Sequence, residues 1–134
     1  MPSIDAIEGI GPKYATKLRK ARIRTTEGLL KQGATRTGRK NVAAATGFTP
    51  EQVMEWVNRA DLMRVKGIGE EYSDLLEAAG VDTVKELKNR KPANLHTKLV
   101  AVNEKKRLVR RLPTEQMVAK WIAYAMKLPA VVKY

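Results

Sequence analysis

The chain has 134 residues, with 26 Lys and Arg against 14 Asp and Glu, which gives a formal net charge of +12. Apolar residues make up 43% of it, enough for the core of one compact domain or two small units. The lack of cysteine excludes disulfides, thiolate metal sites and a cysteine nucleophile. The sequence has no leader pattern and no apolar run of about 20 residues, so we expect a cytoplasmic protein with no membrane partner.

The excess of positive charge favours a polyanionic partner, because Lys and Arg that neutralise phosphates release counterions. Nucleic acid is the first expectation. The alternative is a charged surface that serves solubility alone.

One short pattern occurs twice, 58 positions apart, as IEGIGPKY over residues 7–14 and VKGIGEEY over residues 65–72. The same offset aligns Leu18 with Leu76 and Thr25 with Thr83, and later it grows to 64. The sequence therefore predicts two divergent halves, residues 1–62 and 63–134. Neither half has many large apolar groups, so we expect them to pack together as one unit.

The first half reads as helices. Pro12 is typical of a first helical turn. The helix after it places apolar side chains on one face, at Tyr14, Ala15, Leu18 and Ala21. Thr25 is the expected N-cap of a short helix, and a further helix is expected from an N-cap at Thr37 to a closing Gly47.

The last helix of each half has a similar start. Thr49-Pro50-Glu51-Gln52 combines an N-cap, a first-turn proline and a capping-box residue, and it aligns with Pro113-Thr114-Glu115-Gln116. Thr83 is expected to cap a short helix of the second half. The last helices are expected to bury Val53, Trp56 or Val57, and Ala60 in the first half, and Met117, Val118, Trp121 and Tyr124 in the second. No stretch alternates with period two, so the expected fold is all-α.

Each Gly-Ile-Gly turn has a composition suited to phosphate. The glycines permit unusual backbone angles and a close approach, while Ile10 and Ile68 anchor the turns in the core. The helix that follows presents unpaired N–H groups and the positive end of its dipole. The alternative is a turn that only connects two helices.

The residues after the two turns differ in charge. After the first turn, a basic stripe lies opposite the face of Tyr14 and Leu18, at Lys13, Lys17 and Lys20. In the second copy these positions hold Glu71, Leu75 and Ala78, with further acidic residues at Glu70, Asp74 and Glu77. We therefore predict that the first turn is the better phosphate site. The second turn is either structural or meets a basic protein surface.

A second basic segment lies late in the chain, at Lys105, Lys106, Arg107, Arg110 and Arg111. If it is helical, Leu108 and Leu112 face inward and the basic side chains form an outer surface that contacts phosphate. The alternative is a solvated helix face. Arg36, Arg39 and Lys40 are candidates to extend the patch.

Catalytic and metal sites have little support. His96 is the single histidine and has no nearby acidic or cysteine ligands, so packing or surface placement is expected. No nucleophile–base set, phosphate-loop signature or metal-spaced cluster occurs, so we expect no enzyme and no cofactor. Trp56 and Trp121 are expected in the core.

These patterns resemble the helix-hairpin-helix superfamily, and most closely a bacterial domain-of-unknown-function family with two such motifs. The likeness covers essentially the whole chain, and its most telling segments are residues 61–72, 75–83, 92–96 and 109–113. It implies a SAM-domain-like helical fold. It also implies sequence-independent binding of duplex DNA through the hairpin amides, at Gly9, Ile10, Gly11, Lys13, Gly67, Ile68 and Gly69. Glu70 and Glu71 depart from the DNA-binding pattern.

The sequence therefore predicts a module that binds the nucleic-acid backbone with little base specificity, and it favours DNA over RNA. The alternative is a protein-interaction adaptor whose acidic second turn docks a basic partner, including a role beside a DNA-processing enzyme.

Overall fold

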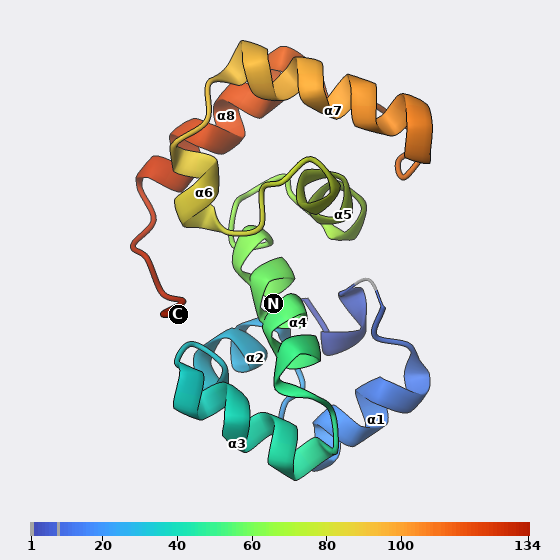
Figure 1. Ribbon diagram of the computed structural model, residues 1–134, viewed down its shortest axis with the longest axis vertical. Coiled ribbons are helices and arrows are strands. Elements are labelled where there is room, and N and C mark those ends of the chain that lie inside the picture. Colours follow the sequence, from blue (N-terminus) through green and yellow to red (C-terminus); the bar gives the residue numbers. More distant parts are fainter. Residues whose placement is uncertain (1, 8) are drawn as a thin grey trace. The chain divides into compact units, whose positions relative to one another are not determined.

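The computed structural model describes residues 2–7 and 9–134 (Figure 1). Glu8, which belongs to the first Gly-Ile-Gly pattern, lies outside the described residues. The described part is helical and holds no strand beyond an isolated bridge between Ser3 and Thr25, which confirms the predicted all-α fold. It divides into two compact units, one that runs up to Asp61 and includes Val131–Tyr134, and one from Leu62 to Ala130. The expected packing of the two halves against each other stays a prediction.

The first unit consists of η1 (Ile4–Ala6), α1 (Pro12–Lys20), α2 (Thr26–Gln32), α3 (Arg36–Thr46) and α4 (Pro50–Leu62). Pro12 begins α1, as its fixed backbone angle predicts. The Thr25 hydroxyl accepts the Gly28 N–H at 2.9 Å and so caps α2. The Thr49 hydroxyl accepts the Gln52 N–H at 3.1 Å at the start of α4. Both predicted caps are confirmed.

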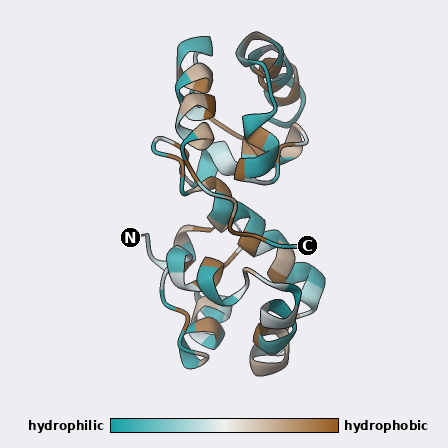
Figure 2. Cartoon of the chain, turned by 90° about the vertical axis from the view of Figure 1, so that its left-hand side faces the viewer, coloured by the Kyte–Doolittle hydropathy of each residue, from teal (hydrophilic) through white to brown (hydrophobic). Residues whose placement is uncertain are grey.

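The second unit consists of α5 (Glu70–Ala78), α6 (Val84–Lys88), α7 (Pro92–Lys106) and α8 (Glu115–Met126). Helix α8 packs against α6 and α7, and α5 packs against α7. Thr83 caps α6 as predicted, since its hydroxyl accepts the Glu86 N–H at 3.2 Å. The helices of both units carry both apolar and polar residues, as expected of helices with one buried side (Figure 2).

The start of α3 differs from the prediction. Its N-cap is Thr35, not Thr37, because the Thr35 hydroxyl accepts the Gly38 N–H at 3.0 Å. The predicted end is confirmed, since Gly47 closes the helix in the left-handed conformation at φ 82°.

The late basic segment is helical only as far as Lys106, so the inward-facing arrangement considered for a helix over residues 105–112 does not form. Helix α7 ends at Lys106, and Arg107 leaves it with a left-handed backbone at φ 48°. The Asn103 side chain then holds the chain, because its Oδ1 accepts the Val109 N–H at 3.0 Å and its Nδ2 donates to the Val109 carbonyl at 3.3 Å. Val109 is therefore buried in place of Leu112, which is 40% exposed.

The last helices of the two halves correspond at an offset one residue longer than the expected 64. Thr114 caps α8 through the Met117 N–H, so its counterpart is Thr49, 65 positions earlier. The same shift pairs Trp56 with Trp121, and both indoles are buried as predicted. Burial is also confirmed for Val53, Val57, Ala60 and Val118. The expected burial of Tyr124 is wrong, since its side chain is 40% exposed.

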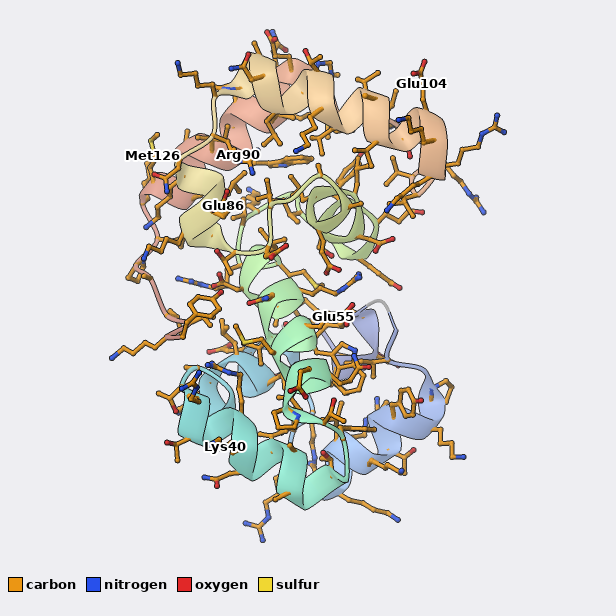
Figure 3. All side chains as sticks on the ribbon, in the orientation of Figure 1. Lys40, Glu55, Glu86, Arg90, Glu104 and Met126 are labelled. Atoms are coloured by element: carbon orange, nitrogen blue, oxygen red, sulfur yellow. The ribbon has the colours of Figure 1, made fainter. Side chains whose placement is uncertain are left out.

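The residues 131–134 are held by Arg39, which is 5% exposed. Its guanidinium donates to the carbonyls of Gly33 at 2.8 Å, Ala34 at 3.2 Å and Lys133 at 2.7 Å. Burial lowers the pKa of Arg39 below its ordinary value, with Arg36 acting in the same direction and Tyr134 against it. Arg39 is therefore a structural cation and does not extend a surface patch. Lys40, by contrast, projects from α3 (Figure 3).

Candidate nucleic-acid interface

The two Gly-Ile-Gly turns have the same backbone geometry. Gly9 and Gly67 have φ of 91° and 96°. The Ile10 N–H donates to the Ile7 carbonyl at 3.1 Å, and the Ile68 N–H donates to the Val65 carbonyl at 3.1 Å. At residues 65–68 this combination is typical of a type II turn, whose third residue needs a positive φ.

A buried tryptophan lies next to each turn. A Cβ added at Gly9 would lie 3.6 Å from Trp56 Nε1, and one at Gly67 would lie 3.0 Å from Trp121 Nε1. Ile10 and Ile68 are each 4% exposed, so they anchor the turns as predicted. The first glycine of each pattern is thus required by its backbone angle and, at Gly67, by the indole too.

The second glycine of each pattern lies on the open side. Gly11 and Gly69 cap α1 and α5 with extended backbones, and a Cβ at either would meet nothing within 4 Å. Among the described residues, no atom accepts a hydrogen bond from the N–H of Gly11 or Lys13. The first turn therefore presents exposed amides at the positive end of α1.

The three lysines of the predicted stripe are all exposed, at Lys13, Lys17 and Lys20. None forms an ion pair within the described part of the chain. Arg19, on the same helix, lies 3.8 Å from Asp5 and is partly neutralised.

The lysine stripe was predicted to lie opposite the face of Tyr14, but one of its lysines contacts the aromatic cluster that includes Tyr14. Tyr14 is 42% exposed and not part of the sealed core. Its ring packs edge-on against Phe48 at 5.1 Å between centroids, and Lys17 Nζ lies 5.6 Å from the centroid of the Phe48 ring. Phe48 in turn contacts Trp56 at 4.9 Å between centroids. The aromatic cluster thus fixes the side of α1 from which the lysines extend.

The second turn opens an acidic helix, as predicted. Glu70 and Glu71 are exposed in the first turn of α5, and Leu75 is fully buried, which confirms that its face is internal. A phosphate at this helix start would meet two carboxylates.

The sequence reasoning missed the other side of this turn. A groove of about 510 Å³ runs beside Gly67 and is lined by Lys66, Met117, Lys120, Trp121, Ala123, Tyr124 and Lys127. Lys120 and Lys127 come from α8 and its C-cap, two helical turns apart. The spacing of Lys120, Tyr124 and Lys127 along the sequence predicts that they share one face of a helix, and this pattern could have indicated the groove.

The late basic residues are exposed, at Lys105, Lys106, Arg107, Arg110 and Arg111. The first two are in the last turn of α7 and the others follow it. The Tyr72 hydroxyl donates to the Arg111 carbonyl at 3.1 Å, which brings this segment to α5. The structure thus places these residues in the second unit with Gly67, Ile68 and Gly69, and the lysine stripe in the first with Gly9, Ile10 and Gly11.

A family model described as a domain of unknown function, DUF4332, matches residues 8–128. The chain belongs to the DUF4332 family. No curated protein and no solved structure matches it significantly. The expected membership of a domain-of-unknown-function family is therefore confirmed.

This DUF4332 chain shows no metal centre in the part that the structure describes, where no group of three or more His, Asp or Glu converges. His96 is half-buried, and its Nε2 lies 2.9 Å from the Pro113 carbonyl, so it packs between α7 and the start of α8. None of the helices built from the described residues is both long and apolar enough to cross a bilayer.

Proposed function

We propose that this DUF4332 chain binds the backbone of duplex DNA without base specificity, and that its two Gly-Ile-Gly turns are the hairpins of tandem helix-hairpin-helix motifs. The observation that carries the proposal is the first turn. Within the described residues, no atom accepts a hydrogen bond from the amide of Gly11 or Lys13 at this helix start, and Lys17 and Lys20 are exposed along the same helix.

The chemistry of this surface supports a phosphate ligand. The amides donate hydrogen bonds, the helix dipole favours negative charge, and Gly11 leaves room for an oxygen to approach the main chain. Such contacts read the phosphate and sugar, which every duplex shares, so they position the protein without reading sequence. The net charge of +12 adds long-range attraction.

Fluorescence anisotropy with labelled random-sequence duplex DNA over a range of salt concentrations tests the proposal. The variant Lys13→Glu, Lys17→Glu, Lys20→Glu should bind more weakly. The slope of log affinity against log salt should become shallower by about 0.9 for each phosphate that the variant no longer neutralises. The matched control is Lys85→Glu, Lys91→Glu, Lys98→Glu, which makes the same charge change at exposed lysines of the second unit.

Equal duplex binding by the α1 variant and the wild type would overturn the proposal, as would an equal loss of affinity in both triple variants.

A second candidate, a protein-interaction adaptor, is favoured by the exposed Glu70 and Glu71 at the start of α5. It predicts negligible duplex affinity at every salt concentration. The same titration therefore separates the two functions.

A further inference from the structure

We propose that the groove beside Gly67 is a binding site for single-stranded nucleic acid, with phosphates on its lysines and a base stacked on Tyr124. This site belongs to the second unit and stands apart from the duplex contact proposed for the first. The groove lining holds three lysines and no carboxylate.

The positive charge of the groove favours a polyanionic ligand. Lys66, Lys120 and Lys127 are exposed, and none forms an ion pair within the described residues. They border the groove from two elements, the turn before α5 and the face of α8. Several unpaired cations around one hollow favour a ligand with repeated negative charge over a single anion.

The groove of the first unit that is lined by Arg36, Arg39 and Lys40 is a weaker candidate. Its lining includes Glu51, and its Arg39 is already engaged by three backbone carbonyls.

The apolar lining then distinguishes single strand from duplex. Tyr124 is 40% exposed and lies between Lys120 of α8 and its C-cap Lys127, and Met117 and Ala123 line the same groove. A duplex presents phosphate and sugar on its outside, which leaves such a surface without a partner. A single strand presents unstacked bases, and aromatic rings between basic residues are the usual platform for them. The volume of about 510 Å³ suits a group the size of a nucleotide.

The turn forms one side of the groove, through Lys66 and Gly67. Gly67 has no side chain, and any Cβ there would lie 3.0 Å from the Trp121 indole that lines the groove. Trp121 is 3% exposed, so it forms the edge of the hollow and leaves Tyr124 as the exposed ring. The same glycine that shapes the turn thus lines the groove without a side chain.

The test measures the affinity of labelled oligothymidylate by anisotropy at low salt. Tyr124→Ala should weaken binding by about tenfold or more, while Tyr124→Phe, which keeps the ring, should bind as the wild type does. Lys66→Glu, Lys120→Glu, Lys127→Glu should also weaken binding by about tenfold or more. The control is again Lys85→Glu, Lys91→Glu, Lys98→Glu.

A second readout does not depend on affinity alone. The chain has two tryptophans, so in a Trp56→Phe background Trp121 is the single one, and oligothymidylate should quench its emission. Loss of quenching in Tyr124→Ala supports the stacked base.

Three outcomes would overturn the inference: equal binding by Tyr124→Ala and the wild type, equal losses of affinity in the groove and control variants, or competition by poly-glutamate as strong as that by oligothymidylate. The last result would assign the groove to acidic peptides. Because the lysine stripe of α1 is intact in all these variants, a failure here leaves the duplex result unaffected.

Discussion

At the scale of single residues, Gly11 and Gly69 occupy equivalent positions at which the effect of a substitution on stability can be measured apart from its effect on duplex binding. Both cap a helix in an extended conformation, and a methyl group at either would meet nothing within 4 Å. Gly11→Ala and Gly69→Ala should therefore each lower the free energy of unfolding by about 1 kcal/mol or less, the difference between glycine and alanine as N-caps.

Their effects on duplex binding should differ. At Gly11 the methyl group would occupy the space that the proposed phosphate approaches, so affinity should fall about tenfold, which corresponds to about 1.4 kcal/mol. Gly69→Ala should leave duplex affinity unchanged. Anisotropy with duplex DNA and urea unfolding of the same samples check both statements, and equal duplex affinities would contradict the assignment of the first turn.

Arg22 carries backbone strain that its counterpart avoids. It follows α1 with φ 68°, whereas Gly80 follows α5 at the equivalent place with φ 92°. The residue after each of them ends its helix in the same way. The Ile23 N–H donates to the Leu18 carbonyl and the Val81 N–H to the Leu76 carbonyl, both at 2.9 Å. A left-handed backbone costs a side-chain-bearing residue about 1 kcal/mol or more.

We therefore expect Arg22→Gly to raise the free energy of unfolding by up to about 1 kcal/mol, and Gly80→Ala to lower it by a similar amount. Urea denaturation measures both. A less stable Arg22→Gly would mean that the arginine side chain contributes more than its backbone costs.

Among the elements, the contact of Arg39 with the segment 131–134 has the clearest energetic role. Replacing Arg39 by alanine would leave the carbonyls of Gly33 and Lys133 without this donor, while the Ala34 carbonyl would still accept the Lys133 N–H at 2.7 Å. We expect a loss of about 2 to 3 kcal/mol in the free energy of unfolding, as for a buried charged hydrogen-bonding group.

Arg39→Lys should recover little of this loss, because an ammonium group cannot reach three carbonyls in the fork geometry of a guanidinium. Arg36→Lys, at an exposed position of the same helix, is the control and should change stability by less than about 0.5 kcal/mol. Urea unfolding measures all three variants, and a wild-type stability for Arg39→Ala would show that the segment is held by other contacts.

The elements also show what sequence can and cannot predict here. Helix starts at Pro12, Thr25, Thr49 and Thr83 were predictable, because caps and first-turn prolines act through neighbouring residues. The end of α7 was not, since it depends on Asn103 reaching forward to Val109 instead of on helical periodicity.

For the candidate site, the lysine stripe followed from spacing along one helix. The groove beside Gly67 brings Lys66 to Lys120 and Lys127 from more than 50 positions away, which no local pattern encodes.

For the whole molecule, the net charge of +12 should act in opposite directions on folding and on binding. Excess like charge repels itself in the compact state, and salt screens that repulsion. The melting temperature should therefore rise between low salt and about 0.15 M salt, while duplex affinity falls over the same range. Differential scanning fluorimetry and anisotropy on one salt series test this, and a falling melting temperature would show that attractive ion pairs dominate the fold.

The bond from Arg39 to Lys133 joins residues 94 positions apart, so the first unit is discontinuous in the chain. During synthesis on a ribosome, helices α1 to α4 emerge and begin to fold long before residues 131–134 are made. Until then the Arg39 guanidinium lacks one of its three carbonyl acceptors. A fragment cut after Asp61 would keep that nascent state permanently, so dissecting this protein at the apparent boundary would yield a first unit whose buried arginine never gains the Lys133 carbonyl.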